Sequence, residues 1–376
     1  MKKTVLIILI LLASLVFTCA GCSDNKESKG RGAAAESQGT QAAGALAAKW
    51  PTKDWSTSTP EKQGLDEWQL ARTHTRIKEN YPNVYSLLVI RNGFLVFEEY
   101  YNGAGKNSYN QVYSVTKSVM SALTGIAIRE ELVAGTGQKA AELIPEYFDP
   151  VDNTKKRDIT IENVLTMTGG LESIDNNYNG YFSSSDWLRY ALDKPLTDQL
   201  GSKFVYNTGL TQILSAVISE KSGMKTKEFA DKYLFKPLNI EVKRWDMDPA
   251  GCYGGGTGLY LTARDMAKFG YLYLNEGNWD GSQIIPEEWA AASITRKVEA
   301  GKGVDYGYLF WISDMENKTT RKTYHTYRAD GAGGQKIVVI PETNMVIVVT
   351  ANINARSRDG ADTQRLIEDY VIQAIK

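Results

Sequence analysis

The sequence predicts an α+β fold in which an antiparallel sheet is formed from both chain ends, is flanked by helices, and carries an inserted, mostly helical region. Two apolar runs rich in β-branched and aromatic residues lie near the start, in VYSLLVIRNGFLVFEEYY. Two more lie near the end, in QKIVVIPETNMVIVVTANI. The region from about 135 to 300 consists mostly of helical segments separated by Gly- and Asn-rich loops. A cleft between the sheet and this helical region is the natural place for a functional site.

The elements follow in a clear order along the chain. Residues 65–80 read as a helix that Tyr81-Pro82 ends. Asn92-Gly93 separates the first two apolar runs and is the strongest short signal for a β-hairpin. Residues 112–129 are long, largely apolar and contain Ala and Met, which predicts a buried helix. The remaining expected elements are helices over 161–167, 186–192 and 209–221, two strands that turn at 341–344, and a closing amphipathic helix over 361–375.

Composition and motifs exclude several classes of function. Lys plus Arg number 43 and Asp plus Glu number 44, so the net charge is -1 and no nucleic-acid partner is expected. The longest basic run, at residues 155–157, is predicted to be a solvated turn. Gly-x-Ser-x-Gly, His-Glu-x-x-His, the P-loop and Gly-x-Gly-x-x-Gly are all missing. With two histidines and no Cys/His cluster, neither a metal nor a cofactor is expected.

The first residues have the layout of a secretory signal, with two lysines, an apolar stretch from Val5 to Phe17 and then small residues. Ala20-Gly21-Cys22 resembles a bacterial lipobox, although Cys19 stands where that motif usually has Leu. The expectation is a lipoprotein signal over 1–22, cut before a lipidated Cys22. The protein would then be anchored to a membrane of the bacterial cell envelope, outside the cytoplasm, on the periplasmic or extracellular face.

Residues 23–49 contain no aromatic residue and much Gly, Ala and Ser, which predicts a flexible tether. The folded domain is expected over 50–376, beginning with Trp50-Pro51. Once Cys19 is removed and Cys22 is lipidated, Cys252 stands alone, so no intramolecular disulfide is expected. Cys252 is predicted to be a small buried hydrophobic residue.

Three pairs in this chain place a lysine three residues after a serine: Ser23/Lys26, Ser114/Lys117 and Ser222/Lys225. Ser23 lies in the predicted tether. Ser222 is followed directly by Gly223, as at the surface end of a helix. The middle pair begins the most apolar helix of the mature chain. Lys117 would lie one turn after Ser114, partly desolvated and near the positive end of the helix dipole. Both effects favour a neutral amine, which can act as a general base beside a serine hydroxyl.

The SVTK segment at 114–117 resembles the Ser-x-x-Lys motif of serine β-lactamases, penicillin-binding proteins and the esterases and amide hydrolases that share their fold. Further segments resemble the class C-like branch of that family, which includes 6-aminohexanoate-oligomer hydrolases, in the expected order over nearly all of 60–376. These segments are ITIENVLTMTGGL (159–171), FVYNTGLTQILSAVI (204–218), GGGTGLYLTARDMAKFGYLYLNEGNW (254–279) and ADGAGGQKIVVIP (329–341).

The resemblance implies a β-lactamase/transpeptidase-like fold and an acyl-enzyme at Ser114. Lys117 would be the base, and Tyr206 the phenol that carries the proton to the leaving group. A free N–H at the helix start would stabilise the oxyanion, with Gly331 as the second donor. Further substrate-binding candidates from the same motifs are Asn207, Thr208, Arg328 and His325.

The sequence departs from the family at two places. The segment FVYNTGLTQILSAVI resembles the second motif of the family, but it reads Tyr-Asn-Thr at 206–208. Thr208 therefore stands where the family usually has Asn. The Lys-Thr-Gly or His-Thr-Gly triplet, which helps to hold a substrate carboxylate, is absent, and residues 328–330 lie about where it should be. These departures favour a small-molecule ester or linear amide as the substrate. Two alternatives stay open: a peptidoglycan-directed D-Ala-D-Ala carboxypeptidase or β-lactamase, and a non-catalytic binding module of the envelope.

Overall fold

The computed structural model describes residues 50–301, 303–357 and 362–376, which belong to one compact unit, Ala47–Lys376. The predicted signal, the tether and Cys22 lie outside these described residues. In the described part no helix is both long and apolar enough to cross a membrane. The main sheet has eight antiparallel strands in the order β2-β1-β12-β11-β10-β9-β8-β7.

The predicted joining of the two chain ends is confirmed. Strand β1 (Val84–Arg91) pairs with β2 (Phe94–Tyr100) on one side and with β12 (Met345–Ala351) on the other. Asn92 and Gly93 both have positive φ, 52° and 78°, as a tight two-residue hairpin requires. Strand β11 (Gln335–Ile340) then lies beside β12. The α+β fold with a sheet built from both termini is therefore as the sequence predicts.

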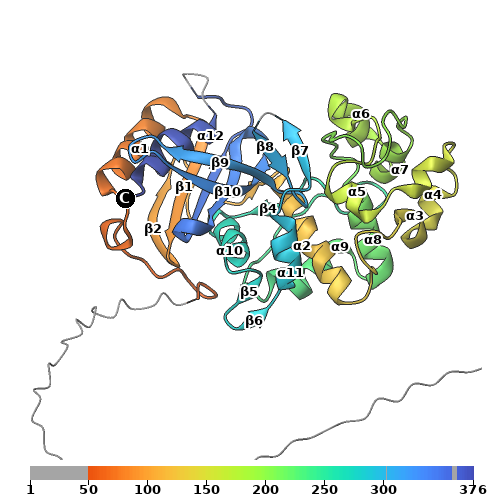
Figure 1. Cartoon of the computed structure of the whole chain (residues 1–376), viewed down its shortest axis with the longest axis horizontal. Helices are drawn as coiled ribbons and strands as arrows, with labels where there is room; N and C mark the ends of the chain where they lie inside the picture. The colour runs from red at the N-terminus through yellow and green to blue at the C-terminus, as the bar shows by residue number, and fades with distance from the viewer. Residues whose placement is uncertain (1–49, 302, 358–361) are drawn as a thin grey trace, which may run out of the picture. The chain divides into compact units, whose positions relative to one another are not determined.

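Both faces of the sheet are covered by helices (Figure 1). Alternate residues of the central strands pack to opposite sides, as a pleated strand requires. On one face, Leu87 and Val349 join the core formed with α1 (Glu67–Asn80) and the C-terminal helices. On the other face, Leu88 and Val348 join the core that contains α2 (Val115–Arg129) and α10 (Ala263–Leu274). The C-terminal region is a short α-helix, α12 (Thr363–Leu366), continued by a π turn (Ile367–Val371) and a 3₁₀ turn (Ile372–Ala374), rather than one regular helix.

Four strands on the C-terminal side of the sheet were missing from the sequence expectation. They are β7 (Val298–Gly301), β8 (Val304–Tyr306), β9 (Trp311–Asn317) and β10 (Lys322–Gly331). Buried and exposed residues alternate along part of β9, whereas β10 buries residues 326–329 in a row, including the polar Thr326 and the charged Arg328. Both strands therefore lack a continuous apolar run. The sheet is therefore larger at this end than predicted.

The inserted helical region gathers beside the sheet, where Figure 1 shows α3–α7 on the right. Helix α2 (Val115–Arg129) packs against α8, α11 and β10, and every residue from Val115 to Ala127 is buried. This burial fixes the start of α2 in the middle of the molecule. The other elements are α3 (Ala140–Leu143), α4 (Pro145–Phe148), α5 (Ile161–Leu165), α6 (Tyr178–Ser183), α7 (Trp187–Leu192), α8 (Gln212–Ser222), α9 (Thr226–Ala230), α10 (Ala263–Leu274), α11 (Glu287–Ser293), and the short strands β3 (Asn110–Gln111), β4 (Tyr260–Leu261), β5 (Asn278–Trp279) and β6 (Ser282–Gln283).

Candidate active site

Ser114 is the N-cap residue of the buried helix α2 and is half-buried. Its side chain makes no capping hydrogen bond, so the hydroxyl is available to other partners. The preceding residue, Tyr113, has a left-handed backbone with φ 48°, an uncommon conformation for an aromatic residue. Strain of this kind persists only where the surrounding structure fixes it. The N-terminal end of α2 also carries backbone N–H groups without intrahelical partners and the positive end of the helix dipole.

Lys117 lies one turn further along α2 and is 1% exposed. Its Nζ contacts Ser114 Oγ at 3.0 Å, Thr208 Oγ1 at 3.0 Å and the Gly256 carbonyl oxygen at 2.9 Å. Burial lowers the pKa of Lys117 to about 7, while the charge of Asp175 opposes this shift. Lys117 therefore loses its proton far more readily than an ordinary lysine does.

The three contacts match the valence of a neutral amine. An uncharged Lys117 has two N–H groups and one lone pair. The Gly256 carbonyl can only accept, and the Thr208 hydroxyl can accept, so these two take the N–H groups. The lone pair is then left for the hydroxyl proton of Ser114. Gly256 can approach this closely only as glycine, since a Cβ there would lie 2.5 Å from Thr211 Oγ1.

Tyr206 lies against the same amine. Its ring centroid is 4.8 Å from Lys117 Nζ, and the ring stacks on Trp311 at 5.6 Å with an interplanar angle of 24°. Burial raises the pKa of the Tyr206 phenol, and a hydrogen bond with Ser114 opposes that effect. Burial thus acts on both groups in the same physical way, because it disfavours an ammonium and a phenolate alike. The result is a neutral amine that can accept a proton and a neutral phenol that can donate one.

Two residues that the sequence analysis did not single out hold the segment of Tyr206 and Thr208. Asp175 Oδ2 accepts a hydrogen bond from the Thr208 backbone N–H at 3.0 Å, and the Ser173 hydroxyl donates to the Tyr206 carbonyl oxygen at 2.7 Å. Ser173 also lies 3.2 Å from Asp175 Oδ2. Both come from the loop after Gly169-Gly170. No recognisable spacing connects them to residues more than thirty positions later.

Asn207 does not join this group, although it stands between two residues that do. It is 2% exposed, and its Oδ1 accepts from the backbone N–H groups of Gly209 at 3.0 Å and Leu210 at 3.3 Å. Its Nδ2 donates to the Glu172 carbonyl oxygen at 3.3 Å. The amide is therefore used to shape the turn that leads into α8. Thr208, by contrast, reaches Lys117 directly.

Arg328 and His325 of β10 also have their polar partners outside the Ser114 group. Arg328 Nε donates to Asp330 Oδ2 at 2.9 Å, and its guanidinium reaches Ser313 Oγ at 2.6 Å. His325 is exposed, and its Nδ1 lies 3.1 Å from Asp314 Oδ1. None of these contacts includes a residue of the Ser114 group. The expectation that both side chains approach the substrate is therefore not supported by their packing.

The segment 329–341 contacts the Ser114 cavity through Ala332. Gly331 packs against the backbone of the residues that precede Ser114, where a Cβ on it would lie 2.2 Å from the Val112 carbonyl oxygen. Ala332, and not Gly331, lines the cavity that contains Ser114. Of these two residues, Ala332 is therefore the one in contact with the space that a substrate would fill.

Ser114 opens into a cavity of about 640 Å³, a size that suits a small-molecule ligand. Most of its wall is apolar or aromatic. The lining residues are Gln111, Tyr113, Ser114, Tyr178, Phe182, Trp187, Thr208, Asp246, Met247, Thr257, Gly258, Ala332 and Ile353. Among the described residues, no group of three or more His, Cys, Asp or Glu side chains could hold a metal ion.

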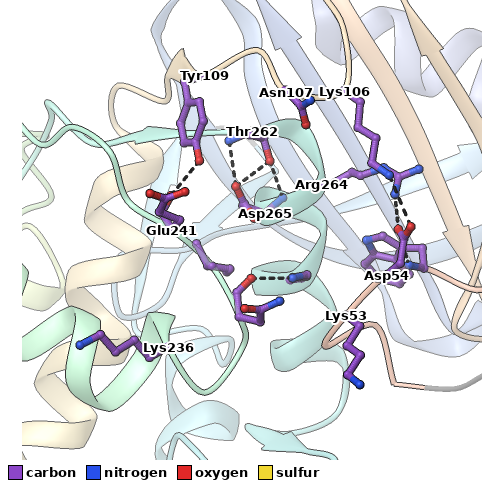
Figure 2. Close-up of a pocket in the computed structure, with 14 residues that line it drawn as sticks. Lys53, Asp54, Lys106, Asn107, Tyr109, Lys236, Glu241, Thr262, Arg264 and Asp265 are labelled. Carbon is purple, nitrogen blue, oxygen red and sulfur yellow. Dashed lines mark hydrogen bonds and ion pairs between the residues drawn. The ribbon is translucent and has the colours of Figure 1, made fainter.

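A second cavity, of about 560 Å³, is lined by charged residues and shares none of them with the first (Figure 2). Several of its charged side chains have partners within the fold. Arg264 forms an ion pair with Asp54, and Asp265 Oδ2 accepts from the Thr262 hydroxyl at 2.6 Å at the start of α10. Lys268 Nζ donates to the carbonyl oxygens of residues 238 and 239 at 3.0 and 2.9 Å. These contacts stabilise the loops around α10, and we assign the chemistry to the Ser114 cavity.

The comparisons with known proteins agree with this geometry. The model of the family described as Beta-lactamase matches residues 76–372. The chain is 22% identical over 285 residues to a 6-aminohexanoate-dimer hydrolase of Paenarthrobacter ureafaciens, covering 70% of this chain and 71% of that protein.

Two solved structures share the fold. A D-stereospecific amidohydrolase from Streptomyces sp. has a TM-score of 0.64 and 13% identity, over 81% of this chain and 98% of that one. A penicillin binding protein from Bacillus halodurans has a TM-score of 0.59 and 17% identity, over 74% and 94%. At such identities a structural likeness establishes the architecture alone.

Proposed function

Because this chain belongs to the Beta-lactamase family, whose model spans most of its length, we propose that it is a serine hydrolase that works through an acyl-enzyme on Ser114. The observation that carries the proposal is the 3.0 Å contact between Lys117 Nζ and Ser114 Oγ, made by an amine whose pKa burial lowers to about 7. A base must lie within hydrogen-bonding reach of the proton it takes and must be unprotonated at the working pH. Lys117 meets both conditions.

In the first step, Ser114 Oγ attacks the carbonyl carbon of the substrate while its proton passes to Lys117 Nζ. A bond forms between Oγ and the acyl carbon, and the bond from that carbon to the leaving oxygen or nitrogen then breaks. Tyr206 donates its phenolic proton to the leaving group and recovers one from the Lys117 ammonium. The raised pKa of Tyr206 keeps the phenol protonated for this transfer.

In the second step, a water molecule attacks the acyl carbon with Lys117 again as the base. The bond between Oγ and the acyl carbon then breaks, and the Lys117 ammonium returns its proton to Ser114 Oγ as the carboxylic acid leaves, so atoms and protons balance over the cycle. The tetrahedral oxyanion of each step would accept hydrogen bonds from backbone N–H groups. We assign these to Ser114, at the start of α2, and to Ala332, which lines the same cavity.

An ester or a linear amide is the substrate class that this site favours. The family triplet that helps to hold a substrate carboxylate is missing from the sequence. Arg328, the cation in the corresponding segment 328–330, donates hydrogen bonds to Asp330 and Ser313 instead. Two of the similar proteins are described as hydrolases of amides, a 6-aminohexanoate dimer hydrolase and an amidohydrolase. This likeness supports the same bond class here.

The membrane anchor remains a separate part of the proposal. We propose that Cys22 is lipidated and holds the enzyme at the outer side of a bacterial membrane, on the strength of the Ala20-Gly21-Cys22 segment. Mass spectrometry of the mature N-terminus should find a diacylated Cys22. An unmodified N-terminus at another residue would contradict the anchor and leave the catalytic proposal intact.

Purified full-length protein, assayed with a panel of p-nitrophenyl esters and linear amides, tests the proposed activity. Turnover that Ser114→Ala abolishes would support a serine esterase or amidase. Covalent labelling of Ser114 by fluorescent penicillin, with no ester turnover, would favour a peptidoglycan-directed enzyme instead. No Ser114-dependent turnover or labelling of any kind would leave a non-catalytic binding module as the better account.

A further inference from the structure

The wall of the Ser114 cavity collects nearly all of the large apolar side chains that the described residues leave exposed. Five such side chains have more than two-fifths of their surface exposed: Trp68 at 66%, Tyr178 at 42%, Phe182 at 43%, Met247 at 44% and Ile353 at 42%. Four of the five line this one cavity, and only Trp68 does not. Single exposed apolar residues need no explanation, but a cluster of them marks a surface that a ligand covers.

From this cluster we propose that the acyl half of the substrate is an uncharged, extended apolar chain, held along Tyr178, Phe182, Met247 and Ile353. The inference deepens the proposed function and rests on it, because it takes Ser114 as the nucleophile. Ser114 lines the same cavity as these four side chains. A chain bonded to its hydroxyl would therefore lie against them and remove their apolar surface from water.

The aromatic part of this wall is fixed before any substrate arrives. Tyr178 and Phe182 lie one turn apart on α6 with their rings stacked, 5.9 Å between centroids at 14°. Behind them a small separate core packs Phe182 edge-on against Tyr181 at 5.1 Å and Trp187 at 5.2 Å. Rings held in this way lose little freedom when a ligand binds, which favours affinity.

The charges around the cavity exclude an anionic chain. No Lys, Arg or His stands among the described residues that line it, and the only charged member is Asp246. Asp246 already accepts a hydrogen bond from Arg244 Nε at 2.7 Å. Lys117 contacts Ser114, but it is buried behind this residue and must be neutral to act. A carboxylate on the chain would lose water and gain no cationic partner among the described residues that line this cavity.

The cavity lies on the acyl side of the reacting bond. Ala332, whose N–H we assign to the oxyanion, is part of the wall together with Ser114. Tyr206, which we assign to the leaving group, is not part of it. The leaving group must reach the phenol, so the half of the substrate that fills the cavity is the one that stays on Ser114.

Three p-nitrophenyl esters with the same leaving group test this assignment on the full-length protein: the acetate, the hexanoate and the monoester of adipic acid. The last two have six-carbon chains and differ only at the far end, a methyl group against a carboxylate. We expect kcat/KM for the hexanoate to exceed that for the acetate by at least about tenfold, since each methylene in an apolar pocket contributes measurably. We expect the adipate monoester to fall below the hexanoate by a similar factor.

Variants of the wall connect these ratios to the four side chains. Phe182→Ala and Met247→Ala should each lower the hexanoate-to-acetate ratio severalfold, and Met247→Lys should raise the turnover of the adipate monoester relative to the hexanoate. Trp68→Ala is the matched control. It removes the fifth exposed apolar side chain, outside the cavity, and should leave both ratios unchanged.

The outcomes separate the inference from the function on which it rests. Ser114-dependent hydrolysis with no gain for the hexanoate, or with the adipate monoester equal to it, would overturn the inference alone. A chain-length effect for alkyl acetates, varied in the alcohol half, together with none in the acyl half, would overturn the assignment to the acyl side. Failure of Ser114-dependent hydrolysis for every ester would overturn both proposals.

Discussion

The amine of Lys117 lies 3.0 Å from the hydroxyl oxygen of Ser114, and its two other partners, Thr208 Oγ1 at 3.0 Å and the Gly256 carbonyl at 2.9 Å, can both serve as acceptors. This arrangement satisfies a neutral amine completely when the serine donates to it. It leaves a protonated amine without a carboxylate in direct contact. The geometry and the burial thus favour the same protonation state, which is the state that a general base needs.

The first prediction concerns the dependence of activity on pH. Lys117 must be neutral in the free enzyme, so kcat/KM should fall as the pH drops through about 7, the pKa that burial gives this amine. The charge of Asp175 raises that pKa against the effect of burial. Asp175→Asn keeps an oxygen that can accept from the Thr208 N–H, and it should move the acidic limb to lower pH. A limb that stays in place, or moves up, would contradict this account.

The second prediction separates the phenol from the amine. Tyr206→Phe keeps the ring that stacks on Trp311 and removes only the proton donor. Loss of a general acid typically costs about 10²–10⁴-fold in rate. We expect a loss of this size for amides, and a smaller one for p-nitrophenyl esters, whose leaving group needs no proton. Equal losses for both substrate types would argue that Tyr206 acts by packing alone.

The third prediction concerns stability and needs no substrate. The pKa of Lys117 is about 7 in the folded chain and 10.5 in its ordinary state, so between these values the unfolded chain binds a proton that the folded chain does not. Raising the pH therefore stabilises the wild type relative to Lys117→Met, by about 1.4 kcal/mol per pH unit between about pH 7 and 10. The difference should be flat below about pH 6. Urea unfolding of both proteins across this range measures it, and a difference that is flat throughout would refute the lowered pKa.

The fourth prediction tests the oxyanion donor. Ala332 is the first residue of the 3₁₀ turn 332–334 and follows an extended Gly331, with φ -126° and ψ 150°, a position at which proline is tolerated. Ala332→Pro removes the N–H and should lower kcat by about 10²–10³-fold. Ala332→Ser keeps the N–H and serves as the control, with a much smaller change expected. Equal effects of the two substitutions would place the donor elsewhere.

The parts of the fold that could be predicted are those in which one local pattern determines the structure. Asn92-Gly93 between two apolar runs specifies a hairpin, and the long apolar stretch after Ser114 specifies a buried helix. Strands β9 and β10 were not predicted because polar and charged residues interrupt their apolar ones, so neither contains an apolar run. Their place in the sheet is set by the pairing of β10 with β11 and of β9 with β10, which a local pattern does not reveal.

The residues of the site likewise fall into those that a local motif predicts and those that only the folded structure brings together. The family motifs predicted that Ser114, Lys117 and Tyr206 would meet, and the structure brings these three side chains together. Asp175 and Ser173 hold the Tyr206 segment through contacts across more than thirty residues, and no spacing rule announces them. The motif also favoured Asn207, but the side-chain amide of this residue accepts hydrogen bonds within the turn that leads into α8. Burial and hydrogen bonding in three dimensions decide such roles.

The most direct measurement of the central claim is the site of covalent modification by a fluorophosphonate probe, mapped by mass spectrometry of peptides. Ser222 is the matched control, because it has the same spacing to Lys225 but lies at the end of α8, where its hydroxyl donates to the Ile218 carbonyl. We expect stoichiometric labelling of Ser114, lost in Ser114→Ala, unchanged in Ser222→Ala, and slower as the pH falls through about 7. Labelling that persists in Ser114→Ala, or that appears on another residue of the wild type, would contradict the central claim.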